Sequence, residues 1–384
     1  MACLPARGPS VVLATLLTVC TSLAQQPVAA TRPAPLTVPA VARPETSPPP
    51  PAPVRVAPTR PAQLWPVTRL RGADYVSVRD LAARFALQPA WTRPERALTL
   101  SDARVRFTFE ANQRDFYFDG LRVFLGVPVV AGKDSLWLGL PDVIKVVAPL
   151  FRPADHLIQL PAMPPKTIVL DPGHGGIDPG TENKRLGVNE KTFALDVARR
   201  LEKILAAGGW RVRLTRTDDH ELSRDKKTDL AMRDDLANKN QADLFLSIHF
   251  NSAPEAITGV ETYSMAPQFM LSTGDDTGDE MTNVAYPSNR LDFANLLFGE
   301  KLHRAMIGLL QTPDRGFKRG RRAVLRLLDC PGALVECGYL SNDTETRRIA
   351  TPEYRQKIAE ALAEGVQSYA AALAALRPVE LPAR

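Results

Sequence analysis

The stretch Thr167-Ile-Val-Leu-Asp171-Pro-Gly-His174-Gly-Gly176 joins a short apolar run to a glycine-rich turn that carries a histidine. The apolar run is typical of a buried strand, and the proline and glycines predict a sharp turn where the strand ends. A histidine is costly to bury without a partner. His174 therefore marks either an unusual turn or a functional site.

Strands and helices alternate from this stretch onward. We expect a helix over 189–206, a strand over 211–214, a helix opened by Thr228, strands over 244–250 and 260–264, a helix over 291–310, a strand over 333–337 and a last helix with Thr351 as N-cap and Pro352 at its first position. Such alternation predicts that residues 165–378 form an α/β domain with a mostly parallel central sheet flanked by helices.

Residues 64–161 have a different pattern. Short alternating segments at 75–78, 97–100, 105–109, 115–118 and 127–130 predict strands, and 80–85 predicts a short helix. We therefore expect a small strand-rich α+β domain before the larger one. Its loose motifs resemble the stalk domain first recognised in copper amine oxidases and found on many wall-associated bacterial proteins.

The first residues predict export. Arg7 precedes an apolar core over 11–19 that is too short to span a bilayer, and Ser22-Leu23-Ala24 supplies small residues for cleavage. We interpret 1–24 as a signal peptide, with lipid anchoring at Cys20 as the alternative. The proline-rich residues 25–63 favour an extended linker. These features predict a periplasmic or secreted protein without a stable membrane span.

Composition adds only weak constraints. The 384 residues carry a formal net charge of +6, and the isoelectric point is near 9.2. Because the charges are scattered rather than clustered, we expect no nucleic-acid partner. Export would permit disulfides, yet Cys330 and Cys337 would lie too far apart for a bridge if 333–337 is a strand, so we expect both to be reduced.

Three further residues share the edge of the predicted sheet with His174. His249 ends the apolar run over 244–249, and Glu336 lies near the end of the run over 333–337. Sites in open α/β sheets lie beyond the carboxyl ends of the strands. Glu190 falls on the buried stripe of its helix, at the first turn, and therefore near His174. Two imidazoles and one carboxylate can form a zinc site with an open fourth position.

Each of these residues also has a simpler interpretation. Glu190 could be stabilised by the helix dipole, His174 could merely occupy a tight turn, and His249 could be a hydrogen-bonded core histidine. Glu336 within an apolar run is harder to explain, because a buried glutamate without a partner is strongly disfavoured. Taken together, the four residues favour a metal centre.

The motifs resemble those of the zinc-dependent N-acetylmuramoyl-L-alanine amidases. They are Asp171-Pro-Gly-His-Gly-Gly176, Asn189-Glu190, Ser247-Ile-His249-Phe-Asn251, Gly259-Val-Glu-Thr-Tyr263 and Leu334-Val-Glu336-Cys-Gly-Tyr-Leu-Ser-Asn342. The resemblance implies that His174, Glu190 and His249 bind one Zn²⁺, that Glu336 is catalytic and that Asn251 contacts substrate. The chain also resembles these enzymes in a helix pattern that includes Arg233. We interpret Arg233 as a structural residue.

The resemblance implies hydrolysis of the amide between N-acetylmuramic acid and L-alanine in peptidoglycan, by zinc-activated water with Glu336 as general base. Peptidoglycan would be the partner, and an activator protein is a second candidate. The alternatives are a non-catalytic peptidoglycan-binding protein and a zinc peptidase acting on the stem peptide. We further interpret the polar segment between Ser264 and Leu291 as a flexible lip of the substrate groove.

Overall fold

The computed structural model describes residues 65–159, 164–275 and 280–376, which belong to one compact unit, Pro61–Arg384. The predicted signal peptide, the linker and Cys20 lie outside the described residues. No helix in the described ranges is long and apolar enough to cross a membrane.

The C-terminal part has the predicted α/β architecture. Its sheet has the strand order β13-β10-β14-β17-β15-β16, and only the β15–β17 pair within this order is antiparallel. The mostly parallel sheet is therefore confirmed. The strands are β10 (Thr167–Pro172), β13 (Arg211–Leu214), β14 (Leu244–Asn251), β15 (Val260–Met265), β16 (Asp314–Gly320) and β17 (Gly332–Tyr339), and β11 (Glu182–Asn183) and β12 (Val188–Asn189) form a separate hairpin.

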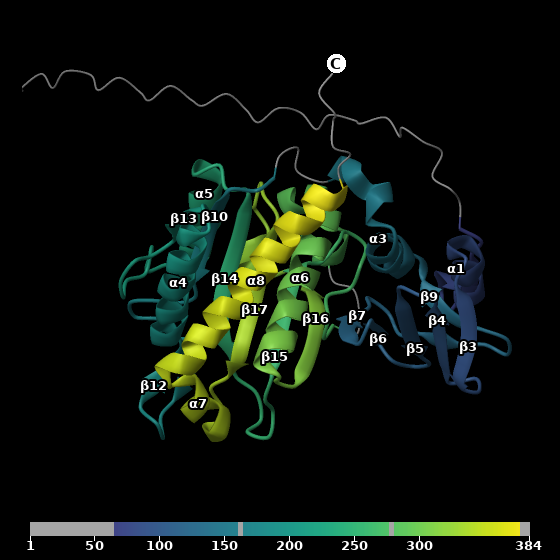
Figure 1. Cartoon of the computed structure of the whole chain (residues 1–384), viewed down its shortest axis with the longest axis horizontal. Coiled ribbons are helices and arrows are strands. Elements are labelled where there is room, and N and C mark those ends of the chain that lie inside the picture. The colour runs from purple at the N-terminus through teal and green to yellow at the C-terminus, as the bar shows by residue number, and fades with distance from the viewer. Residues whose placement is uncertain (1–64, 160–163, 276–279, 377–384) are drawn as a thin grey trace, which may run out of the picture. The chain divides into compact units, whose positions relative to one another are not determined.

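Helices cover both faces of this sheet. Helix α8 packs against both α4 and α6, and these three helices lie on the near face in Figure 1, whereas α5 packs against β10 and the short turn Ala323–Leu325. Alternate residues of β14 accordingly belong to different apolar clusters, with Leu244 and Leu246 in one and Phe245 in the other. The sequence of a strand that is buried on both faces is a continuous apolar run. The helices are α4 (Glu190–Ala207), α5 (Lys226–Lys239), α6 (Asp292–Leu310), α7 (Asp343–Ile349) and α8 (Pro352–Leu376).

The strand-rich region extends the same sheet. Its antiparallel strands β3 to β7 continue from β16, because β7 pairs with β16 in parallel at Val123 and Phe317. These strands are β3 (Gln88–Arg93), β4 (Ala97–Ser101), β5 (Arg106–Glu110), β6 (Asp115–Phe118) and β7 (Leu121–Phe124). A second sheet holds β1 (Thr68–Leu70), β2 (Ala73–Ser77), β9 (Leu136–Gly139) and β8 (Val130–Ala131). Helices α1 (Val78–Phe85) and α2 (Leu140–Asp142) contact this sheet, and α3 (Ala148–Phe151) contacts α6.

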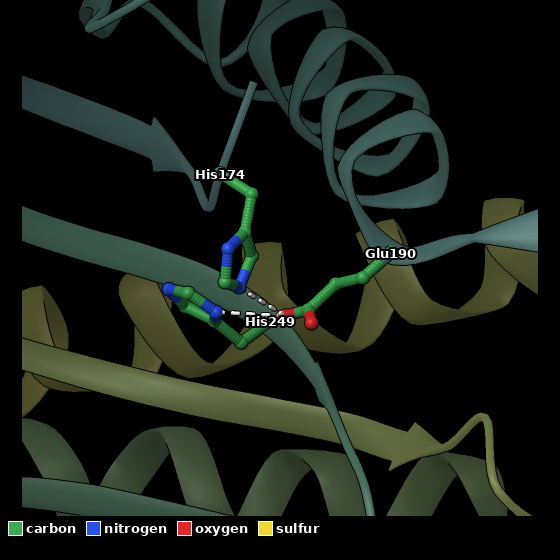
Figure 2. Close-up of side chains that lie close together, drawn as sticks. All are labelled: His174, Glu190 and His249. Carbon is green, nitrogen blue, oxygen red and sulfur yellow. Dashed lines mark hydrogen bonds and ion pairs between the residues drawn. The ribbon is translucent and has the colours of Figure 1, made fainter. Parts of the chain in front are cut away.

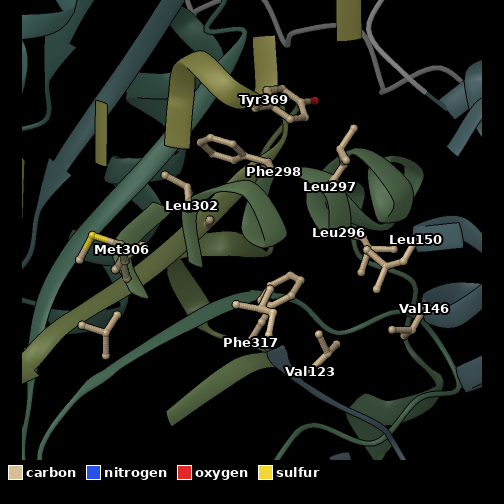
Figure 3. Close-up of a cluster of buried hydrophobic side chains, with 14 of the residues drawn as sticks. Val123, Val146, Leu150, Leu296, Leu297, Phe298, Leu302, Met306, Phe317 and Tyr369 are labelled. Atoms are coloured by element: carbon tan, nitrogen blue, oxygen red, sulfur yellow. The ribbon is translucent and has the colours of Figure 1, made fainter. Parts of the chain in front are cut away.

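The core is continuous across this junction. Figure 3 shows Val123, Val146 and Leu150 of the strand-rich region beside Leu296 and Phe317 of the α/β part. All five side chains are buried, and they belong to one apolar cluster. The two regions thus share apolar core as well as strand pairing.

Two expectations about local structure were wrong. The predicted strand over 127–130 is reduced to β8, because Pro128 has no N–H and the amides of Gly126 and Val127 donate to the Asp142 carboxylate instead. The helix expected to open at Thr228 begins at Lys226, since Asp225 is the N-cap and accepts the Thr228 amide at 2.9 Å. The expectation for the cysteines is confirmed, since Cys330 and Cys337 are free and buried.

Candidate metal centre

His174, Glu190 and His249 point toward one another in the folded chain (Figure 2). One side-chain ligand atom from each residue lies within 4.8 Å of the others. Glu190 Oε1 lies 3.2 Å from His174 Nε2 and 2.7 Å from His249 Nδ1. The first residue belongs to the turn after β10, the second begins α4, and the third lies near the end of β14.

The turn that carries His174 is held by buried arginines. Arg233 of α5 donates to Asp171 at 2.8 Å and to the carbonyl oxygens of Pro172 and His174. Arg216 donates to the carbonyl oxygens of Pro172 and Gly173, at 3.0 and 2.9 Å. These bonds fix a turn in which His174 has a φ of +62°, a left-handed conformation that is unfavourable for a non-glycine residue. Arg233 thus supports the turn.

His174 is oriented by Asp178, which the sequence reasoning missed. Its Nδ1 lies 2.9 Å from Asp178 Oδ2, which leaves Nε2 directed at Glu190. The Asp178 carboxylate also accepts a hydrogen bond from Lys226. Partial burial opposes the charged form of Asp178, but the hydrogen bonds from Lys226 and His174 lower its pKa to about 2. A carboxylate on the second nitrogen of a histidine fixes the ring and its tautomer, as at many metal centres.

Glu190 is the most buried of the three candidate ligands, with 3% of its side chain exposed. Its Oε1 accepts the Phe250 amide at 3.0 Å, and its Oε2 accepts the Thr181 amide at 2.8 Å. Burial opposes its charge, yet hydrogen bonds from His174 and His249 and their charges hold the pKa of Glu190 well below its ordinary value. The carboxylate therefore stays ionised, as a metal ligand must.

Glycine is required where the backbone approaches these ligands. A Cβ built on Gly180, whose φ is +68°, would lie 2.5 Å from Glu190 Oε2 and 2.6 Å from His174 Cδ2. A Cβ on Gly173 would lie 2.3 Å from the His249 ring. The glycines of the segment therefore make room for the ligands as well as permitting the turn.

Glu336 lies beside the three ligands and lines the same pocket, which has a volume of about 730 Å³. It is the register partner of His249 on β17, and its Oε2 is buried without a hydrogen-bond partner among the described residues. Burial and the negative charges of Glu190 and Glu261 raise the pKa of Glu336 well above its ordinary value. A raised pKa is suited to a group that gains and loses a proton.

Asn251, predicted to contact substrate, lines this pocket at the end of β14. Its side-chain amide donates to Glu261, a buried carboxylate that also accepts hydrogen bonds from Tyr263 and Lys318. Glu261 is the register partner of Glu336 on β15. No role for Glu261 was predicted from the sequence, although a glutamate within the predicted strand over 260–264 is itself a signal of a functional site.

The residues present fit a zinc ion. Two imidazoles and a carboxylate form a known zinc donor set, and the unpartnered buried oxygen of Glu336 lies in the same pocket. The acids also favour a cation here, because the hydrogen bonds and charges of Glu190 and Asp178 outweigh burial and raise the pKa of His174.

The described residues between Ser264 and Leu291 are not among those that line this pocket. They follow the end of β15 that lies away from Glu336, where Ala266 donates to the Gly320 carbonyl oxygen. Arg321 donates to the carbonyl oxygens of Pro267 and Met270, and Arg114 to that of Ser272. Because β15 runs antiparallel to β17, the chain leaves the site at Glu261 and reaches the opposite sheet edge before this segment begins.

The fold and the site define an α/β protein with a candidate three-ligand metal centre at the carboxyl edge of its sheet. Residues 168–368, or 201 of 384, match the family model described as N-acetylmuramoyl-L-alanine amidase. The chain belongs to this family.

Individual relatives carry matching names. The chain is 34% identical over 206 residues to an uncharacterized cell wall amidase of Bacillus anthracis, which covers 53% of this chain and 35% of that protein. It is 32% identical over 236 residues to the N-acetylmuramoyl-L-alanine amidase AmiA of Escherichia coli, which covers 53% of this chain and 76% of AmiA. The chain thus spans about a third of the first relative's length and about three quarters of the second's.

Solved structures give similar matches. The catalytic domain of CwlV, an amidase from Bacillus (Paenibacillus) polymyxa var. colistinus, is 30% identical with a TM-score of 0.44, covering 53% of this chain and 97% of that one. The CwlD amidase from Clostridioides difficile, solved in complex with the GerS lipoprotein, is 26% identical with a TM-score of 0.45. The match covers 54% of this chain and 99% of that one.

Proposed function

We propose that this protein is a zinc-dependent N-acetylmuramoyl-L-alanine amidase that hydrolyses the amide between N-acetylmuramic acid and L-alanine in peptidoglycan. Family membership and the convergence of His174, Glu190 and His249 with Glu336 in one pocket support the proposal. The observation that carries it is the unpartnered, buried Glu336 carboxylate beside three potential zinc ligands. Zinc at this place would supply a Lewis acid for the scissile carbonyl and lower the pKa of a water molecule.

Side chains of this protein supply proton transfer, ligand orientation and substrate contact. Glu336 accepts a proton from the attacking water and returns it to the leaving amine as the carbon–nitrogen bond breaks. Burial of Glu336 and the negative charges around it raise its affinity for that proton. Asp178 holds the His174 ring in place, and the Asn251 side chain, fixed by Glu261, contributes a polar contact to substrate at the pocket wall.

The rest of the chain fits an exported wall enzyme. Residues 1–24 act as a signal peptide in this proposal, and the protein reaches the periplasm or the exterior. The strand-rich region serves as a stalk or wall-binding module that shares its sheet with the α/β part. Sequencing the amino terminus of the mature protein tests the export step. Assaying the purified protein alone tests whether an activator protein is required.

Digestion of purified sacculi with and without a chelator, followed by mass analysis of the products, tests the function. An amidase releases intact stem peptides that begin with alanine, and the chelator abolishes the release. Fragments cut within the stem peptide would identify a zinc peptidase instead. No released peptide, from a protein that binds both zinc and sacculi, would indicate a non-catalytic wall-binding protein.

A further inference from the structure

One wall of the metal-site pocket is formed by the chain between β13 and α5. Hydrogen bonds tie this wall to neighbouring segments: Gly176 donates to Asp219 at 2.9 Å, and Ile177 donates to Glu221 at 3.2 Å. Leu222 donates to Asp229 of α5 at 2.9 Å. The backbone of the wall is therefore held close to the turn that carries His174.

Arg224 stands out among the cations on this wall. The other lysine and arginine side chains that line the pocket have partners, since Arg233 pairs with Asp171 and Asp229 and Lys226 pairs with Asp178. Arg224 is exposed and lines the pocket, and it makes no hydrogen bond or ion pair with any described residue.

The acids of the pocket do not neutralise this guanidinium. Asp178, Glu190 and Asp229 are bonded to a lysine, to histidines and to an arginine, respectively. Glu221 accepts the Ile177 amide. Arg224 thus offers an unpaired, planar cationic group in the pocket that holds the candidate reaction centre.

We propose that Arg224 binds a free carboxylate of the substrate's stem peptide, close to the scissile amide. This inference rests on the proposed function and names the part of the substrate that the pocket recognises. A guanidinium pairs with a carboxylate through two parallel hydrogen bonds, which gives both affinity and orientation. A stem peptide offers such a group where its second or third residue is a dicarboxylic amino acid with one carboxylate outside the peptide bonds, and amidation of that carboxylate would remove the recognised group.

The test uses the full, zinc-loaded protein and three muramoyl-peptides: one with both carboxylates free, one amidated at the second residue and one amidated at the third. We expect the wild type to prefer the free peptide over one amidated form by roughly tenfold in kcat/KM, mainly through KM. Whichever amidation matters identifies the carboxylate that is bound. Arg224→Ala should abolish the preference, and Arg224→Lys should retain part of it.

Lys227→Ala is the matched control, because Lys227 is an exposed cation three residues away that does not line the pocket. It should leave the preference unchanged. The free stem peptide gives a readout besides turnover, and its inhibition constant should rise roughly tenfold in Arg224→Ala. Equal cleavage of all three peptides by the wild type, or an intact preference in Arg224→Ala, would overturn the inference while the amidase function stands. No cleavage of any peptide would instead overturn the proposed function, and the inference with it.

Discussion

His249 and Glu336 are direct register partners on the adjacent parallel strands β14 and β17. Register therefore places a candidate metal ligand and a candidate proton carrier side by side on rigid backbone. Beyond His249 the pairing shifts, and Asn251 pairs with Tyr339. A rigid sheet is well suited to hold catalytic groups at a fixed separation.

Glu336→Gln separates proton transfer from metal binding. The amide keeps the size of the side chain but cannot take a proton from water, so turnover should fall by roughly 10²- to 10⁴-fold. Zinc content should stay near that of the wild type, because Glu336 is not among the three candidate ligands. Elemental analysis and product release from sacculi measure the two effects. Near-wild-type turnover would remove Glu336 from its proposed role.

His174→Ala should lose zinc, because it removes one of the three candidate ligands. His220→Ala is the control, since His220 is exposed and bonds Asp218 rather than a candidate ligand. Elemental analysis after dialysis against metal-free buffer compares the two variants. Full zinc occupancy in His174→Ala would exclude this histidine as a ligand.

Asp178→Asn tests the orientation of the His174 ring. Loss of the charged partner at Nδ1 should weaken zinc binding by roughly 10- to 100-fold, the usual effect of removing such a support. The exposed Asp235, on α5, provides the control substitution Asp235→Asn. Competition with a zinc-binding dye measures both affinities. Equal affinities would show that Asp178 does not support the centre.

Gly180→Ala and Gly187→Ala form a matched pair. Both glycines have positive φ, +68° and +65°, but only a Cβ at position 180 meets other atoms, namely those of Glu190 and His174. Backbone strain should therefore cost each variant about 1 kcal/mol of unfolding free energy. Only Gly180→Ala should also lose zinc affinity, by more than tenfold. Urea unfolding and zinc titration test this, and similar zinc affinities would contradict it.

Asp234→Asn should make the protein more stable at high pH. Asp234 is buried on α5, its Oδ1 has no hydrogen-bond partner among the described residues, and burial raises its pKa to about 7. The pKa of an aspartate in the unfolded chain is about 4. At pH values between this unfolded pKa and the folded pKa of Asp234, only the folded state keeps the proton, so the unfolding free energy of the wild type falls as pH rises.

Asparagine does not ionise, so the variant does not lose stability through the burial of a charged carboxylate at high pH. Asp234→Asn should therefore raise the unfolding free energy by about 4 kcal/mol at pH 8, with little change near pH 4. Urea unfolding at both values measures the difference, with Asp235→Asn as the exposed control. A gain of equal size at both pH values would show that the titration of Asp234 is not its cause.

Local sequence patterns predicted much of the fold and of the candidate site. The strand β13 has the predicted bounds, and Thr351 caps α8 by accepting the Tyr354 amide at 3.3 Å. The predictions failed where distant groups decide the structure. β16 has no alternating apolar pattern in Asp314-Arg-Gly-Phe-Lys-Arg-Gly320, yet it is a strand because it lies between β15 and β7.

The sequence by itself determined most of the strands and helices of the α/β part and which four polar residues would meet, because apolar periodicity, caps and turn residues act between near neighbours. Only the tertiary structure decided that Asp178 orients His174, that Glu261 faces Glu336 and that the strand-rich region joins the sheet at Phe317. It also placed the described residues that directly follow β15 at the edge opposite the site. These relationships depend on strand order, register and packing between residues far apart in the chain, which no local pattern encodes.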